Sequence, residues 1–401
     1  MAKKEGRGSG KNVFFKNQEM NFTLLRALMG THAQGATIGE CLAVVLNTKN
    51  SDHEAFIRAW DELGRANASR AEAAAAAGDA VRARECWLCA SNYFKSATIS
   101  VNPFEERHKR FWELSRDAFE RAGALFDIPM ERLAVPIEGK LLNCYFVPAA
   151  KTRSPTLFIV TGGEGSAAES YFWAGAYALR NGYSLFLYEG PGNYGPMHES
   201  GLTVRPDSEA SIGRALDLLC ARPDVDQERM AIMGISFGGY LAARAAAHDA
   251  RIKALIPDTP LRDFYLELSQ IYPQLFQAPK LIDFLKDHVM SYSDKAGLDL
   301  LLWEGGVKSF GEMSAKREIL KQYSLVGMEH RIRCPTLALV GESEGAQILA
   351  QAEEFLRNIG SERKSLRVFT EKEGAASHCQ ADNALLMNQV MISWLNEVFA
   401  G

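Results

Sequence analysis

The chain has 401 residues and a formal net charge of −4, with 47% hydrophobic and 23% charged residues. This composition is typical of a globular protein with a large core, and the length fits roughly two to three domains of about 150 residues or one large α/β domain with an addition. The charge is nearly balanced and no apolar run approaches the roughly 20 residues of a membrane span, so neither nucleic acid nor a membrane is expected as a partner.

The chain begins with a basic, glycine-rich stretch, MAKKEGRGSGK, that no apolar segment follows. We predict a disordered basic arm over residues 1–18 rather than a secretory signal. The seven cysteines are scattered and odd in number, which argues against a disulfide framework. Cys86 and Cys89 form a lone C-x-x-C without a second pair. We therefore expect a cytoplasmic protein with reduced thiols, no metal and no other cofactor.

Residues 19–130 are predicted to form a helical N-terminal domain. Apolar residues recur at steps of three and four through SRAEAAAAAGDAVRARECWLCASNYFKSATISV. Gly78 and Asp79 interrupt this pattern, which predicts an antiparallel helix pair. The next stretch, NPFEERHKRFWELSRDAFERAGALF, predicts another amphipathic helix, with Asn102 as its N-cap and Pro103 in its first turn.

From residue 131 to residue 401 the pattern changes to short apolar runs that alternate with helices. LAVPIEGKLLNCYFVPA predicts a hairpin that turns at Glu138 and Gly139. Continuous apolar strands separated by helices predict a mostly parallel sheet covered on both faces. From about 261 to 330 the chain is helical and aromatic-rich, which we interpret as a lid insertion above the edge where such sheets bind ligands. The other strands are predicted at 156–161, 183–188, 229–234, 252–257, 335–341 and 365–370.

The stretch GISFGGY places Ser236 between Gly234 and Gly238. The apolar strand RMAIMG leads into it and the helical stretch GYLAARAAAH follows, which is the strand–turn–helix context of a nucleophile elbow. The turn is sharp, so a side chain two residues before or after the serine would clash with its neighbours. The hydroxyl would lie at a helix N-terminus, where the dipole favours negative charge. We predict that Ser236 is a nucleophile, the alternative being a tight turn without catalysis.

A serine hydroxyl needs a base to become nucleophilic. His378 lies in a loop after the last predicted strand, and it alone fits the chain order serine, acid, histidine. The strand PTLALVG is followed by two glutamates and no aspartate. We favour Glu344 as the acid that orients the imidazole, with Glu342 as its rival.

An oxyanion would need two backbone N–H donors beside the serine. One is expected from Phe237, the residue after the nucleophile. The other is expected from the glycine-rich loop TGGEGS, at Gly163 or Glu164, where backbone can approach a substrate closely. An ordinary glycine-rich turn is the alternative for this loop.

Two further groups of polar side chains follow predicted strands at the same sheet edge. The first group could contact substrate, although shaping of the loop is the favoured role. One residue of the second group could handle a substrate proton, although capping of the following helix is the favoured role. The aromatic side chains of the lid suggest either a large apolar ligand or packing within the lid. The polar residues are Tyr188, Glu189, Asn193 and His198, then Asp258, Asp263, Tyr265 and Glu267; the aromatic ones are Phe264, Tyr265, Tyr272, Phe276, Phe284 and Trp303.

Several longer motifs point to a known family. They are GATIGECL (35–42), CASNYFKSA (89–97), TGGEGS (161–166), YEGPGNYG (188–195), VRPDSEASI (204–212), GISFGGY (234–240) and EGAASHCQADN (373–383). With these motifs, nearly the whole chain resembles the α/β-hydrolases that include the bacterial 2,6-dihydroxypseudooxynicotine hydrolase and the fungal yellowish-green pigment hydrolase. This group is related to the fermentation-respiration switch protein.

The resemblance implies an α/β-hydrolase fold with a helical N-terminal domain packed over the active site. It implies a triad of Ser236, Glu344 and His378, and cleavage of a C–C bond beside a carbonyl in aromatic or polyketide-like substrates. The chain departs from the family where a glutamate replaces the usual aspartate of the acid loop.

We therefore expect an enzyme, a serine hydrolase that acts on a small molecule without a cofactor. It would cleave a C–C bond next to a carbonyl, or an ester or lactone, through an acyl-enzyme. Two alternatives stay open: transfer of the acyl group to an alcohol or amine by the same triad, and a non-catalytic binding or regulatory role. A homodimer through the helical domain also stays open.

Overall fold

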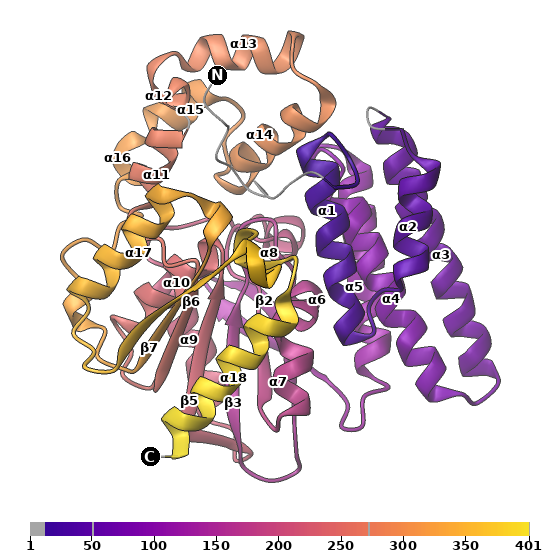
Figure 1. The fold of residues 1–401 in the computed structure, drawn as a ribbon, viewed down its shortest axis with the longest axis horizontal. Coiled ribbons are helices and arrows are strands. Elements are labelled where there is room, and N and C mark those ends of the chain that lie inside the picture. Colours follow the sequence, from indigo (N-terminus) through magenta and orange to yellow (C-terminus); the bar gives the residue numbers. More distant parts are fainter. Residues whose placement is uncertain (1–12, 50–51, 272, 401) are drawn as a thin grey trace.

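The computed structural model describes residues 13–49, 52–271 and 273–400, so most of the predicted arm lies outside the described residues. Within them, eight strands form one sheet in the order β1-β2-β4-β3-β5-β6-β7-β8. Helices cover both faces of this sheet, which lies at the lower left in Figure 1. The strands are β1 (Glu131–Ile137), β2 (Lys140–Val147), β3 (Ser154–Val160), β4 (Ser184–Tyr188), β5 (Val225–Ile235), β6 (Ala254–Asp258), β7 (Thr336–Gly341) and β8 (Lys364–Phe369).

The first two strands form the predicted hairpin, and the rest of the sheet is mostly parallel. Glu138 and Gly139 both have positive φ, 51° and 76°, as a two-residue turn matched to the strand twist requires. β2 pairs antiparallel with β4, and every later pairing is parallel. This arrangement confirms the predicted fold class.

Alternate residues of the central strands face two different cores. On β3, Phe158 and Val160 belong to the core beneath α9, α10 and α17, while Leu157 and Ile159 belong to the core beneath α7 and α18. The central strands are therefore buried on both faces, as their continuous apolar runs predict. The helices are α6 (Ala167–Ser170), α7 (Ala176–Arg180), α8 (Tyr194–Ser200), α9 (Ser208–Cys220), α10 (Phe237–Ala246), α17 (Ala346–Asn358) and α18 (Ala384–Ala400).

The helices before the sheet pack against one side of it (Figure 1). Asp79 caps the second helix of the predicted pair, since its side chain accepts a hydrogen bond from the Arg82 N–H at 3.0 Å. Inside the bundle, the Trp60 and Tyr93 rings stack with centroids 5.7 Å apart. The helices are α1 (Gln18–Met29), α2 (Ile38–Asn47), α3 (His53–Ala76), α4 (Ala80–Ile99) and α5 (Glu106–Gly123).

One predicted helix start is wrong. The helix α5 begins at Glu106 with Glu105 at its N-cap, three residues later than the predicted cap. The Asn102 side chain instead accepts from the Phe104 N–H and donates to the Asp299 carboxylate, at 2.6 Å, in the lid. A tertiary partner, which local sequence does not reveal, therefore draws Asn102 out of the helix.

The lid lies above the sheet edge, and its helix α14 is on the side of the lid that faces α1 (Figure 1). It has a small core of its own around Leu302 and Phe310, both fully buried. Of its aromatic side chains, Phe264 packs on Phe237 with 4.6 Å between centroids, whereas Phe284 is exposed. Tyr272 lies outside the described residues. The lid helices are α11 (Phe264–Ile271), α12 (Gln274–Gln277), α13 (Pro279–His288), α14 (Tyr292–Glu304), α15 (Phe310–Ala315) and α16 (Arg317–Leu320).

Short turns of helix complete the structure, and two of them matter for the site. Glu342–Glu344 (η4) follows β7, and His378–Gln380 (η6) lies between β8 and α18. The others are Gly30–Ala33, Tyr171–Gly175, Glu329–Arg331 and Glu371–Glu373.

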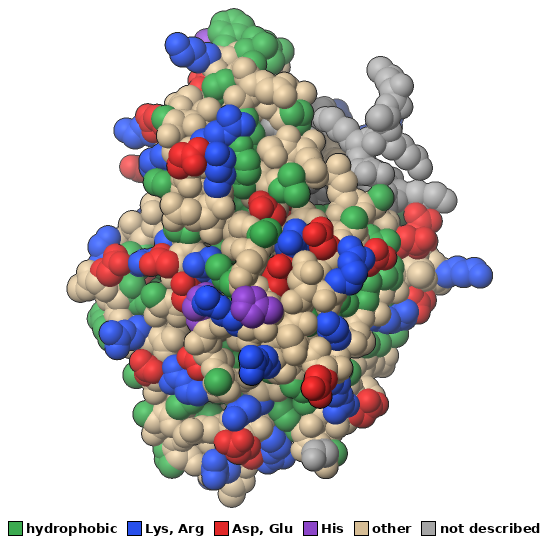
Figure 2. All heavy atoms as spheres, turned by 90° about the vertical axis from the view of Figure 1, so that its left-hand side faces the viewer, with side chains coloured by type: hydrophobic (Ala, Val, Ile, Leu, Met, Phe, Trp, Pro, Cys, Tyr) green, Lys and Arg blue, Asp and Glu red, His purple; other side chains and the backbone are tan. Residues whose placement is uncertain are grey.

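The surface mixes both signs of charge. Figure 2 shows acidic and basic side chains interspersed over one face, with hydrophobic side chains gathered at the upper tip. There α13 exposes Leu281 and Phe284, and Val289 follows it. In the described part of the chain, no helix combines the length and apolar character needed to cross a membrane.

Candidate active site

Ser236 lies at a strained turn between β5 and α10. Its backbone has φ 58° and ψ −126°, which places a non-glycine residue in the left-handed half of conformational space. A Cβ on Gly234 would overlap the Gly238 carbonyl oxygen, and one on Gly238 would overlap the Val160 carbonyl oxygen. Both flanking glycines are therefore required by the close approach of backbone around the serine, as a nucleophile elbow demands.

The structure brings Ser236, His378 and Glu344 into one chain of hydrogen bonds. His378 Nε2 lies 2.8 Å from Ser236 Oγ, and His378 Nδ1 lies 2.6 Å from Glu344 Oε2. The imidazole thus joins the hydroxyl on one side to the carboxylate on the other. The three residues come from the ends of β5, β7 and β8, which meet at one edge of the sheet.

The Glu344 carboxylate is fixed by three donors. Besides the imidazole, Thr259 Oγ1 donates to Oε2 at 2.6 Å and the Gly341 N–H donates to Oε1 at 2.8 Å. Glu342 lies elsewhere, since its carboxylate accepts from the Glu371 N–H at 2.9 Å. Of the two glutamates left open by the sequence, the structure places Glu344 against His378.

A second buried carboxyl group, Asp258, lies behind Glu344. Burial first, and then the negative charge of Glu344, raise the pKa of the Asp258 carboxyl group well above its ordinary value. Its carbonyl oxygen accepts from the Ser236 N–H and from Cys379 Sγ, at 3.2 Å for the thiol. Asp258 thus supports the backbone of the elbow and is absent from the lining of the pocket at Ser236.

A pocket of about 40 Å³ opens at Ser236 and His378. Gly163 and Glu164 line it, whereas the ring of Phe237 packs against Phe264. The N–H of Phe237 is at the first position of α10, where no helical carbonyl can accept it. The remaining lining residues are Phe22, Arg26, Thr161, Gly162, Gly165, Glu169, Ser170, Trp173, Ile235 and Cys379.

The glycine-rich loop is held by Asn193. The Asn193 amide donates to the carbonyl oxygens of Gly162 and Gly163, at 2.5 and 2.8 Å. A Cβ on Gly162 would come within 2.9 Å of the Ser236 Cβ, so the loop passes directly over the serine. Asn193 therefore shapes this loop, which is the favoured of the two roles that the sequence left open.

The other polar candidates are distributed around the site rather than gathered in its pocket. Tyr188 donates to Ser211 Oγ at 2.8 Å inside the core. Asp263 accepts from the Leu266 N–H at 2.8 Å, which is a helix cap. The His198 ring nitrogen Nε2 lies 2.9 Å from Nδ1 of His108. None of these three candidates lines the pocket at Ser236.

Glu189 is a buried carboxyl group whose oxygens accept from the N–H groups of Ala167 and Gly195, at 2.6 and 3.0 Å. Burial raises its pKa to about 7, against the opposing effect of these two donors. The two N–H groups belong to the starts of α6 and α8, so one side chain ties together the elements that flank the glycine-rich loop.

A buried charge network beside the pocket was missed in the sequence analysis. Arg26 on α1 binds Glu164 at 2.6 Å and binds both oxygens of Glu169, at 2.7 and 2.6 Å. Lys95 on α4 also contacts Glu169. The only signal in the sequence is a cation, Arg26 or Lys95, within each of two otherwise ordinary helices, and this does not reveal that the two side chains meet.

The charges of this network change the protonation equilibria of its members. Burial lowers the pKa of Lys95 to about 8, and the nearby Arg26 adds to this effect. Burial opposes ionisation of Glu169, but the two cations outweigh it and lower its pKa to about 2. Two cations from the helical domain thus balance the carboxylates of Glu164 and Glu169.

Across the described ranges, no cluster of three or more His, Cys, Asp or Glu side chains is arranged to hold a metal ion. Cys86 and Cys89 are free thiols.

The mostly parallel sheet, the strained serine after β5 and the histidine after β8 define an α/β-hydrolase. The family model for the prolyl oligopeptidase family matches residues 212–277, which span the elbow.

Longer similarities give the family within this class. The chain is 31% identical to the 20-hydroxy-prefusarin hydrolase FUS2 of Gibberella moniliformis over 96% of this chain and 98% of that protein. It is 29% identical to the hydrolase LUC6 of a Fusarium species, over 96% and 97%. Its fold is similar to that of 2,6-dihydroxy-pseudo-oxynicotine hydrolase, with a TM-score of 0.73, 19% identity, and coverage of 92% and 95%. The chain therefore belongs to the family of α/β-hydrolases that includes FUS2 and LUC6, and it is a hydrolase.

Proposed function

We propose that this protein is a serine hydrolase that cleaves a C–C bond next to a carbonyl, in an aromatic or polyketide-like small molecule, through an acyl-enzyme. The observation that carries the proposal is the continuous hydrogen-bonded chain Ser236–His378–Glu344 at the pocket. A histidine between a hydroxyl and a fixed carboxylate can accept the serine proton and be stabilised as the imidazolium.

In the first step, Ser236 Oγ attacks the substrate carbonyl carbon while its proton passes to His378 Nε2. Negative charge then develops on the carbonyl oxygen. We assign its stabilisation to the N–H of Phe237, at the positive end of α10, and to the N–H of Gly163 or Glu164 in the loop over the serine.

In the second step, the C–C bond breaks and its electron pair goes to the departing carbon as an enolate. The His378 imidazolium gives its proton to that carbon, which completes the release of the first product. Water, deprotonated by the same imidazole, then attacks the acyl carbon. The bond between Ser236 Oγ and the acyl carbon breaks, the imidazolium returns its proton to Oγ, and a carboxylic acid is released. Glu344 holds the imidazole in the tautomer that both proton transfers require.

The choice of a C–C bond rests on the family. A relative that matches nearly the whole chain is a 20-hydroxy-prefusarin hydrolase, and the sequence resembles pigment and oxynicotine hydrolases. A departing enolate needs a second carbonyl to carry its charge, so β-dicarbonyl compounds are the expected substrates. Esters and lactones would pass through the same acyl-enzyme with an alkoxide as the leaving group.

A fluorophosphonate probe tests the serine. We expect Ser236 to be labelled in the wild-type chain and His378→Ala to abolish labelling, because the hydroxyl loses its base. Glu344→Gln should lower kcat by about 10³- to 10⁴-fold, as expected when the orienting carboxylate of a triad is neutralised. Glu342→Gln is the matched control and should leave kcat unchanged. Equal losses in both glutamine variants would contradict the assignment of the acid.

The bond that breaks is tested with an aromatic β-diketone in ¹⁸O-labelled water. C–C hydrolysis places one ¹⁸O atom in the carboxylic acid product and none in the ketone formed from the enolate, measured promptly before exchange with water. Turnover of a 4-nitrophenyl ester but of no β-diketone would replace C–C cleavage with ester hydrolysis. A folded wild-type chain that no fluorophosphonate labels would overturn the serine mechanism itself.

A further inference from the structure

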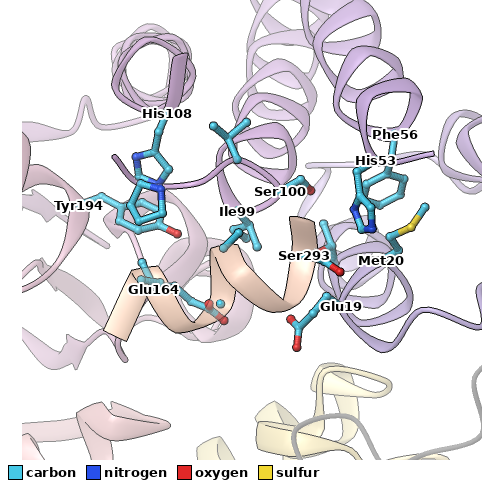
Figure 3. Close-up of a pocket in the computed structure, with 16 residues that line it drawn as sticks. Glu19, Met20, His53, Phe56, Ile99, Ser100, His108, Glu164, Tyr194 and Ser293 are labelled. Atoms are coloured by element: carbon cyan, nitrogen blue, oxygen red, sulfur yellow. The ribbon is translucent and has the colours of Figure 1, made fainter. Parts of the chain in front are cut away.

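A second cavity, also of about 40 Å³, lies between the helical domain and the lid. We name it the lid chamber. Figure 3 shows α14 running along one side of it, with His108, Tyr194 and Glu164 at one end and Glu19, His53 and Phe56 at the other. Three parts of the chain thus build it: the helical domain, the loops at the sheet edge and the lid.

The lid chamber adjoins the pocket at Ser236. Glu164 lines both cavities, and α1 contributes to both, with Met20 and Thr23 on the chamber and Phe22 and Arg26 on the pocket. The ion pair between Arg26 and Glu164, at 2.6 Å, stands where the two cavities meet. A molecule that reacts at Ser236 and extends past this pair would enter the chamber.

The walls of the chamber are part apolar and part polar. Met20, Phe56 and Leu300 are among the apolar side chains. Tyr194 is almost fully buried, and Figure 3 shows its hydroxyl directed into the chamber. Such walls suit a ligand with both hydrocarbon surface and hydrogen-bonding oxygens. The other hydrogen-bonding side chains are Thr23, Ser100, Ser293, His53 and His108.

Among the described residues, the lining of the chamber offers no cation to an anionic ligand. It includes no Lys or Arg, and its carboxylate Glu164 is already paired with Arg26, which lines the other pocket. Burial lowers the pKa of His53, and burial together with the neighbouring His198 lowers that of His108, so both imidazoles are expected to be neutral near pH 7. Neither provides a positive charge that a carboxylate tail would need.

We propose that the lid chamber binds the part of the substrate remote from the scissile carbonyl, and that this part is an uncharged chain or ring carrying hydroxyl or carbonyl oxygens. The inference rests on the proposed serine mechanism and adds to it the shape and charge of the substrate. It makes the substrate elongated, with its reacting carbonyl at Ser236 and its far end against α14.

Gly297 offers a way to fill the chamber without disturbing the triad. It lies on α14 and lines the chamber, and a Cβ added there would meet no atom within 4 Å. Gly297→Phe therefore places a ring in open space, at a helical position where glycine is unfavourable. Gly39→Phe is the matched control, because Gly39 is a helical glycine on α2 with equally open surroundings and no part in either cavity.

The experiment compares the rates at which fluorophosphonates inactivate these variants. One probe has an ethyl tail, a second a tetra(ethylene glycol) tail, and a third a tail of the same length that ends in a carboxylate. In each reaction the serine Oγ–P bond forms, the P–F bond breaks and fluoride leaves as the serine proton passes to His378.

We expect Gly297→Phe to slow the long neutral probe at least tenfold and the ethyl probe less than twofold, with Gly39→Phe unchanged for both. The carboxylate-ended probe should react more slowly than the neutral long probe on the wild-type chain. A fourth probe carries a branched neutral tail of the same length, and Leu300→Ala, which shortens a side chain in the chamber wall, should speed its reaction. A faster inactivation of this variant would show that the probe tail occupies the chamber, and that the effect of Gly297→Phe does not come only from the added ring.

The outcomes separate the two proposals. If the ethyl probe does not label the folded wild-type chain, the serine mechanism fails. If it labels normally but Gly297→Phe slows both probes equally, or neither, the lid chamber does not hold the substrate tail. Faster reaction of the carboxylate-ended probe would overturn the neutral character of the tail.

Discussion

Replacing Glu189 with glutamine should change how the stability of the protein depends on pH. The pKa of Glu189 is raised from 4.5 to about 7 by burial. The folded state therefore binds the proton of the Glu189 carboxyl group more tightly than the unfolded chain does. At pH values between 4.5 and about 7, the folded state carries more protons than the unfolded chain. Stability consequently falls as the pH rises through this window, because ionisation is easier in the unfolded chain.

The size of the effect follows from the shift. A single carboxyl group with pKa values of about 4.5 unfolded and about 7 folded loses about 2.5 kcal/mol of stabilisation between about pH 5 and about pH 8. Glu189→Gln removes this titration while keeping the shape of the side chain. The amide can accept from only one of the two N–H groups that the carboxyl binds, so the variant should also be less stable than wild type at low pH.

The assay is urea unfolding of both chains at about pH 5 and about pH 8, followed by tryptophan fluorescence, with the free energy of unfolding extrapolated to water. The free-energy difference between wild type and Glu189→Gln should shrink by about 2.5 kcal/mol on going to the higher pH. A difference that stays constant would mean that Glu189 ionises alike in both states. The reasoning from burial would then be wrong.

Two further predictions concern stability. Glu169→Gln leaves Arg26 and Lys95 as buried cations without their shared carboxylate. It should therefore lower the free energy of unfolding, measured by urea denaturation, by about 3 to 5 kcal/mol. A loss below about 1 kcal/mol would contradict the charge network. Leu302→Ala opens a cavity in the lid core and should lower the free energy of unfolding of the lid by about 2 to 5 kcal/mol. Hydrogen exchange should then rise in α14 and α15 but not in β3 to β6, and equal increases in both would show that the lid does not open separately.

The sheet and the elbow could be predicted because their signals are local. The strands read as short apolar runs, and the glycines around Ser236 reflect clashes with backbone a few residues away or on the adjacent strand. His378 could be placed because chain order and one loop sufficed to select it. These features depend on spacing along the chain, which a sequence displays directly.

The rest depends on contacts between distant segments. Glu344 and Glu342 are two residues apart and chemically identical, so the choice between them needs the position of His378. Asn102 does not cap α5 as predicted, because its side chain binds Asp299, which lies nearly two hundred residues later in the chain. The lid chamber is lined by α1, α14 and the loop that carries Glu164, and no local sequence pattern predicts that these segments lie together.

The charge network gives the helical domain a role in the proposed chemistry. Glu164 and Glu169 lie beside the pocket where the oxyanion would form, and two carboxylates there would oppose a third negative charge. The hydrolase part of the chain places them there, while the cations that neutralise them, Arg26 and Lys95, come from α1 and α4. A sheet with a complete triad but without these helices would hold its oxyanion in an unfavourable field. The helical domain therefore supplies part of the electrostatics of the site as well as its walls.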